Sequence, residues 1–130
     1  MTIIPIIRCN KIAESIHFYT EVLDFRLFGV WPAATDPAFA VLLRETSELH
    51  LSSHAGDGVP GQSVCVIVED VDGLFASFVS RGLDLGGKLD SPIHQGPVDQ
   101  TWGTREACVD DPDGNKICFV QRTPKKHVVD

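Results

Sequence analysis

The sequence lacks a long apolar stretch, an excess of basic residues and, in residues 1–5, a basic segment ahead of an apolar one. No apolar run approaches the roughly 20 residues that a membrane-spanning helix requires. We therefore expect no membrane partner and no signal peptide. Lysine and arginine number 11 against 18 aspartates and glutamates. Because a nucleic-acid-binding face must be basic, this balance argues against a nucleic-acid partner.

The sequence has few cysteines, and none of them forms a C-x-x-C pair. The four are scattered singly, at Cys9, Cys65, Cys108 and Cys118, and three lie in apolar runs typical of strands. Isolated cysteines commonly pack as small apolar side chains, and thiols stay reduced in the cytosol. We therefore predict buried, reduced thiols in a cytoplasmic protein.

Signatures of nucleophilic or nucleotide-dependent catalysis are also missing. The sequence contains no G-x-S-x-G, no P-loop and no G-x-G-x-x-G. Such motifs therefore predict neither a catalytic residue nor a cofactor.

Apolar periodicity in the first half predicts a strand, a helix and then a pair of strands. The predicted helix carries Ile12, Ile16, Tyr19 and Leu23 at helical spacing. The predicted strands cover residues 3–9, 38–43 and 49–51, with a turn at 44–47 and loops at 31–37 and 54–62.

The second half repeats this order. A β-branched run at 64–68 predicts a strand, and Asp70 begins a helix that ends near Gly82. Loop and weak strand signals fill residues 84–101. Two more strands are predicted at 106–109 and 117–121, on either side of a tight turn at 110–115.

A shift of 59 residues superimposes the two halves. It aligns Ile4 with Ser63, Ile12 with Val71, Ile16 with Phe75 and Tyr19 with Phe78. A long period repeated once indicates a duplicated supersecondary unit. A single curved sheet needs a second layer to cover its inner face. We therefore predict an α+β fold of two βαβββ units that form curved mixed sheets around a cleft.

These units define the expected domain organisation. We expect one domain over residues 1–122, with unit 1 at about 1–55, unit 2 at about 62–122, and a polar, loose tail at 123–130.

Local motifs resemble those of a known superfamily. Residues 18–25 are similar to F-[YW]-x-x-x-L-G-F, with Asp24 in place of the usual glycine, and residues 68–72 match the start of the second helix. Residues 102–106 followed by 111–115 are similar to W-G-x-R-E-x-x-x-x-D-P-x-G-N. The chain thus resembles the vicinal oxygen chelate superfamily of glyoxalases, bleomycin resistance proteins and dioxygenases. It is most similar to the bleomycin resistance proteins.

The resemblance implies four metal-ligand positions, which here are Ile4, His50, Ser63 and Cys118. Divalent metals need converging nitrogen or carboxylate donors, and among these four only His50 is a good ligand. Glu48 shares a strand face with His50 by two-residue alternation and is an alternative donor. We predict no metal, no cofactor and no catalytic residue, which favours a binding protein over an enzyme without deciding between them.

Within the resistance proteins the cleft sequesters a drug without converting it. The resemblance implies stacking on Phe39 and Trp102, with Trp31 nearby, and polar contacts from His50, Ser52 and Ser63. Gly103, next to Trp102, is a further candidate ligand contact. A flat cationic ligand suits such a set. Phe39 has core packing as its alternative role. Arg105 and Glu106 are expected to pair with each other or with a neighbouring strand.

The resemblance further implies a homodimer in which two chains exchange units. Three functions stay open at this point. They are sequestration of a bleomycin-type antibiotic or similar ligand, a metal-dependent lyase or dioxygenase activity, and binding of an unknown metabolite.

Overall fold

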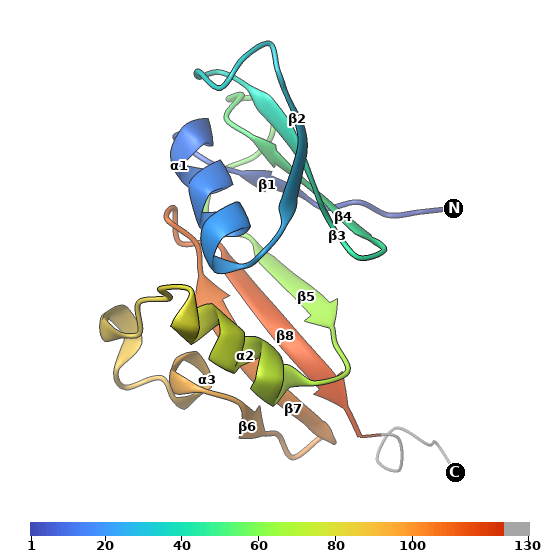
Figure 1. Cartoon of the computed structure of the whole chain (residues 1–130), viewed down its shortest axis with the longest axis vertical. Coiled ribbons are helices and arrows are strands. Elements are labelled where there is room, and N and C mark those ends of the chain that lie inside the picture. Colours follow the sequence, from blue (N-terminus) through green and yellow to red (C-terminus); the bar gives the residue numbers. More distant parts are fainter. Residues whose placement is uncertain (124–130) are drawn as a thin grey trace. The chain divides into compact units, whose positions relative to one another are not determined.

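The computed structural model describes residues 1–123 and divides the chain into two compact units (Figure 1). Unit 1 comprises residues 1–62 and 110–115, and unit 2 comprises residues 63–109 and the chain from Lys116 onward. Of the predicted loose tail, residues 124–130 lie outside the described part. Within the described residues, no helix has both the length and the apolar character needed to cross a membrane.

Unit 1 contains a four-stranded mixed sheet. Its strands are ordered β1 (Ile6–Arg8), β4 (Ser47–Ser52), β3 (Phe39–Arg44) and β2 (Arg26–Trp31). The first pair is parallel and the other pairs are antiparallel. Alternate residues such as Leu42 and Leu51 are fully buried on the side where the unit 1 helix packs. We call this side of a sheet its helix face and the other side its open face.

The helix of unit 1 changes its winding along its length. The α-helix α1 (Ile12–His17) continues into the π-helix η1 (Phe18–Val22). Asp36, from the loop after β2, accepts a 2.8 Å hydrogen bond from the Ile12 main-chain N–H. This bond supplies the helix with a cap that its own N-cap residue does not provide. It also holds the pKa of the Asp36 carboxyl below its usual range.

Unit 2 contains a second four-stranded mixed sheet. Its strands are ordered β5 (Ser63–Ile67), β8 (Lys116–Arg122), β7 (Thr104–Asp110) and β6 (Val98–Asp99). The helix α2 (Val71–Ser80) packs on β8, where the rings of Phe78 and Phe119 lie 4.9 Å apart. The Asp70 side chain caps α2 by accepting from Gly73 N–H, as the sequence predicts for a helix that begins there.

The two sheets have the same topology, since each pairs its first strand in parallel with its last. The predicted α+β fold with two mixed sheets is therefore confirmed. The cleft, the exchange of units between two chains and the residue limits of the domain stay predictions.

Two segments differ from the predicted elements. Residues 26–31 form the edge strand β2, which the sequence does not predict, because a shift in register between Leu27 and Gly29 breaks the alternation that would reveal a strand. Residues 84–101 contain the short helices η2 (Gly86–Lys88) and α3 (Pro92–Gln95) besides β6.

The prediction of four buried, reduced thiols is wrong for three cysteines. Cys108 and Cys118 form a disulfide between neighbouring strands, and Cys65 is an exposed free thiol. Cys9 alone matches the prediction, because it is free and buried, and burial raises the pKa of its thiol to about 11. The sequence holds a signal for the disulfide, since its two cysteines lie at equal distances on either side of Asp113 in the predicted turn.

The 111–115 turn carries a buried polar network within unit 1. Asn115 Nδ2 donates to the Arg8 carbonyl and to Asp111 Oδ2, each at 2.9 Å. Asn115 Oδ1 accepts from Gly61 and Gln62 N–H at 2.9 and 3.0 Å. The side chain of Asn115 thus uses every donor and acceptor that it has for these four bonds.

The phenol of Tyr19 completes the network by donating to Asp111 Oδ2 at 2.8 Å. Burial, together with the Asp111 carboxylate, raises the pKa of Tyr19 above its ordinary range. The motif D-P-x-G-N therefore does more than form a turn, because both of its polar ends are buried and fully bonded.

Replacing Asn115 tests how much this network contributes to the free energy of unfolding. We expect Asn115→Ala to lower the free energy of unfolding by about 2–4 kcal/mol, because it leaves three partly buried main-chain groups without partners and removes one bond to the buried Asp111 carboxylate. Chemical denaturation followed by circular dichroism measures the change. Asn10→Ala, at an exposed position, is the matched control, and equal losses in the two variants would contradict the expectation.

Candidate functional site

Three aromatic rings form a row on the open face of the unit 1 sheet. Trp31 of β2 pairs in register with Phe39 of β3, and their ring centroids lie 6.3 Å apart at 31°. Phe39 meets the ring of His50 of β4 edge-on at 4.9 Å. The edge-on contact of Phe39 and His50 is one of the favoured arrangements of aromatic pairs. The row combines residues that are distant in sequence into one continuous aromatic surface.

A carboxylate stands at one end of this row. His50 Nε2 lies 2.5 Å from Glu48 Oε2, with both side chains on the open face of β4. Because an ionised carboxylate only accepts hydrogen bonds, Nε2 is the donor. We call Trp31, Phe39, His50 and Glu48 the aromatic row. The row combines aromatic faces with a negative charge, which is the chemistry that attracts a cationic, flat molecule.

A glycine sets the position of Trp31. A methyl group at Gly29 would lie 2.5 Å from Cη2 of the Trp31 ring, so the ring covers the bare backbone of Gly29. Trp31 is nevertheless 49% exposed. The ring is thus held flat on its own strand while its outer surface stays accessible.

The hydroxyl of Ser52 already takes part in two hydrogen bonds within unit 1. Ser52 is fully buried, and its Oγ donates to Asp57 Oδ2 at 2.5 Å while it accepts from His54 N–H at 3.1 Å. A ligand contact from Ser52, as the resemblance implies, would require the loop that carries Asp57 to move.

Unit 2 presents a second aromatic side chain beside a carboxylate. Trp102 is 62% exposed, and its Nε1 donates to Glu106 Oε2 at 3.1 Å. Thr104 Oγ1 donates to the same oxygen at 2.5 Å. Gly103 adopts φ 92°, a left-handed conformation that favours glycine and lets the chain turn directly after Trp102. Ser63 is exposed at the start of β5.

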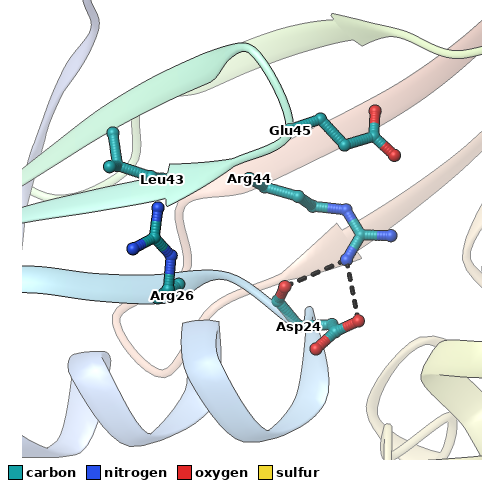
Figure 2. A pocket seen from close by; sticks show the side chains of 5 residues that line it. All are labelled: Asp24, Arg26, Leu43, Arg44 and Glu45. Carbon is teal, nitrogen blue, oxygen red and sulfur yellow. Dashed lines mark hydrogen bonds and ion pairs between the residues drawn. The ribbon is translucent and has the colours of Figure 1, made fainter.

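A hollow of about 270 Å³ lies elsewhere on unit 1, lined by Asp24, Arg26, Leu43, Arg44 and Glu45 (Figure 2). Figure 2 shows the Arg44 guanidinium directed at Asp24, with Nη1 3.0 Å from the main-chain oxygen and 3.2 Å from Oδ2. Asp24 has φ 61°, which explains why the motif carries glycine there. We assign the Arg44–Asp24 contacts to holding this turn and not to ligand binding.

Comparison with known proteins now identifies the family. The profile of the Glyoxalase/Bleomycin resistance protein/Dioxygenase superfamily matches residues 3–119. The chain belongs to this superfamily. No curated protein matches the sequence. The superfamily includes enzymes as well as proteins that only bind, so membership alone does not decide between them.

Solved structures with the same fold share little sequence with the chain. A bleomycin-binding protein complexed with bleomycin has a TM-score of 0.73 at 20% identity, with 95% of this chain and 99% of that chain covered. A bleomycin resistance determinant encoded on the transposon Tn5 has a TM-score of 0.73 at 21% identity, with 94% and 98% covered.

A third structure is an antibiotic binding protein from Streptomyces sp. CB03234. It has a TM-score of 0.69 at 24% identity, with 95% of this chain and 99% of that chain covered. At such identities the likeness shows the fold alone.

The residues at the metal-ligand positions implied by the superfamily do not fit a metal. In unit 1, Ile4 has no donor atom, and His50 is bonded to Glu48. In unit 2, Ser63 offers a neutral hydroxyl, and the sulfur of Cys118 is bound in a disulfide and is no thiolate. Among residues 1–123, no group of three or more histidine, cysteine or acidic side chains is placed to hold a metal ion. The donor set therefore gives no basis for metal-dependent chemistry.

Arg105 and Glu106 do not pair with each other, because successive residues of β7 point to opposite faces. The Arg105 guanidinium bonds Asp72 of α2 through two 2.8 Å contacts and Asp99 of β6 at 3.2 Å. The expected contact with a neighbouring strand is confirmed for Arg105, and the expected mutual pair is wrong. Glu106 is left on the open face with Trp102.

The contact between Gly29 and Trp31 can be tested directly. In a Trp102→Phe background, which leaves Trp31 as the only tryptophan, we expect Gly29→Ala to displace the indole ring. The near-ultraviolet circular dichroism and the fluorescence maximum of Trp31 should change, with less than about 1.5 kcal/mol lost in stability because the ring end is free to shift.

Gly56→Ala is the control for this substitution, since nothing lies within 4 Å of a methyl group there. Unchanged Trp31 spectra in Gly29→Ala would show that the ring does not rest on Gly29.

Proposed function

We propose that the protein binds a flat, cationic small molecule without a metal, and that it sequesters a bleomycin-type antibiotic or a similar ligand without converting it. The observation that carries this proposal is the aromatic row on the open face of unit 1. Its three rings offer stacking surfaces, and Glu48 places a negative charge beside them.

Electrostatics favours a cationic ligand. The negative face of an aromatic ring attracts a cation by about 0.5–2 kcal/mol, and more strongly where water is excluded. The whole chain carries a formal net charge of −7, which raises the local concentration of cations around both units.

Unit 2 supports the proposal independently, since Trp102 and Glu106 repeat the combination of an aromatic ring with a carboxylate. We propose Trp102, Gly103 and Ser63 as further ligand contacts. The names of the structural relatives, which bind bleomycin or another antibiotic, make bleomycin the first compound to test.

The assembly and location of the protein belong to the same proposal. We propose a homodimer, which is the commonest oligomeric state of soluble proteins, with units exchanged between the chains. The cytoplasmic location predicted from single cysteines loses part of its support, because Cys108 and Cys118 are linked and disulfides are rare in the cytosol. It stays a prediction.

Calorimetric titration of metal-free bleomycin into the purified protein tests the proposed function. We expect micromolar or tighter binding near one drug per chain, with no stoichiometric metal in the same sample. Trp31→Ala and Phe39→Ala should each weaken binding by about 10-fold, as expected when an aromatic contact worth about 1.4 kcal/mol is lost.

Phe28→Ala is the matched control for these variants, because Phe28 is an exposed aromatic residue of β2 outside the aromatic row. If titration of bleomycin gives no heat of binding with the wild type or with any variant, the antibiotic is rejected as the ligand. A stoichiometric metal that is lost in His50→Ala would instead favour a metal-dependent enzyme.

Sedimentation velocity tests the dimer. At micromolar concentration we expect a species of twice the 14.2 kDa chain mass. A single species of the chain mass at micromolar concentration would reject the dimer. Ligand binding by each unit would still be tested by calorimetry.

A further inference from the structure

Three of the four cysteines form a row across the sheet of unit 2. Cys65 of β5 is the register partner of Cys118 of β8 in the parallel pair. Cys118 is in turn bonded to Cys108 of β7, the strand next to β8. Cys118 therefore lies between two cysteines, of which one is bonded to it and the other is free.

All three side chains lie on the open face of this sheet. Phe119 packs against Phe78 of α2, so its neighbour Cys118 points away from the helix. Register partners on adjacent strands point to the same side, and a disulfide joins side chains on one side. Cys65 is exposed there, so its thiol is accessible to solvent as well as to Cys118.

The spacing of the row allows either neighbour to bond Cys118. The Cα atoms of the bonded pair Cys108 and Cys118 lie 4.1 Å apart. For Cys65 and Cys118, the usual strand spacing of about 4.8 Å falls within the roughly 4.4–6.8 Å that separates the Cα atoms of most disulfides. Cys65 and Cys108 lie two strands apart, at roughly 9–10 Å by the same spacing, which is too far for a bond. Cys118 is thus the shared partner in any disulfide of this row.

We propose that Cys118 forms two alternative disulfides and that the free Cys65 thiol exchanges with Cys108 for it. The thiolate of Cys65 attacks Sγ of Cys118, a bond forms between these two sulfurs, and the bond between Cys118 and Cys108 breaks. Cys108 leaves as a thiolate and takes up one proton, which replaces the proton that Cys65 released. One disulfide replaces another, so the exchange needs no oxidant or reductant.

The exchanged form is compatible with the packing of unit 2. The released Cys108 is buried, where a neutral thiol packs well as a small apolar group.

The rate of exchange should depend on pH. Partial burial, together with the charge of Glu106 on β7, raises the pKa of the Cys65 thiol, and Arg122 on β8 acts in the opposite direction. Since only the thiolate attacks, exchange should be slow at neutral pH and faster in alkaline solution.

Tryptic mapping of the non-reduced protein tests the proposal. Cleavage after lysine and arginine places the four cysteines in separate peptides, with Cys65 in 45–81, Cys108 in 106–116 and Cys118 in 117–122. After incubation at pH 8.5, alkylation of free thiols and acid quenching, we expect the 117–122 peptide linked to 106–116 in some molecules and to 45–81 in others. Mass spectrometry of the unreduced digest measures both.

Single variants assign each link. With oxidised glutathione as oxidant, Cys108→Ser should form only the link between Cys65 and Cys118, with release of two reduced glutathione molecules. Cys65→Ser should retain only the link between Cys108 and Cys118, and Cys118→Ser should form neither. Cys9→Ser should leave both links unchanged, because Cys9 is buried in unit 1.

Different results contradict the exchange and the assignment of Cys118 as the shared partner. A wild-type digest that contains only the Cys108–Cys118 link after prolonged alkaline incubation would overturn the exchange. Unlinked Cys65 and Cys118 in Cys108→Ser, or a link between Cys65 and Cys108 in any variant, would overturn the assignment of Cys118 as the shared partner. The wild-type result does not depend on whether a variant folds.

Discussion

The side-chain amide of Asn115 is the contact on which unit 1 depends most. It bonds the end of β1 through the Arg8 carbonyl, the chain before β5 through two N–H groups, and Asp111 within its own turn. The bond to Asp111 is buried and the bonds to the main chain are partly buried, and each of these groups would lose a partner if the amide were absent. The turn comes from the chain between β7 and β8, so unit 1 is not one continuous stretch of sequence.

Strand alternation places the functional side chains. In each sheet one set of alternating residues packs against a helix, and the other set lies on the open face. In unit 1 this second set brings three rings and a carboxylate together. In unit 2 it brings together Trp102 with Glu106 and, separately, the row of three cysteines. The same rule therefore yields both the proposed ligand contacts and the proposed disulfide exchange.

The sequence predicted most of the elements because their periodicity is strong. The strands β3, β4, β5 and β8 and the helix α2 lie within a few residues of the predicted ranges. The edge strand β2 was missed, because Gly29 and a shift in register interrupt its alternation. The π-helical turn at 18–22 was also missed, since an apolar stripe alone does not distinguish it from a continued α-helix.

The sequence by itself determined the duplicated α+β fold, the poor donor set for a metal, and the presence of aromatic and polar residues suited to a ligand. The fold follows from local periodicity, whereas the donor positions and the ligand residues follow from the resemblance of local motifs to the superfamily. Only the tertiary structure decided that Trp31 lies in line with Phe39 and His50, that the hydroxyl of Ser52 is engaged, and that Cys118 stands between two other cysteines. Such facts depend on strand register, which main-chain hydrogen bonds between distant segments set and which no local pattern specifies.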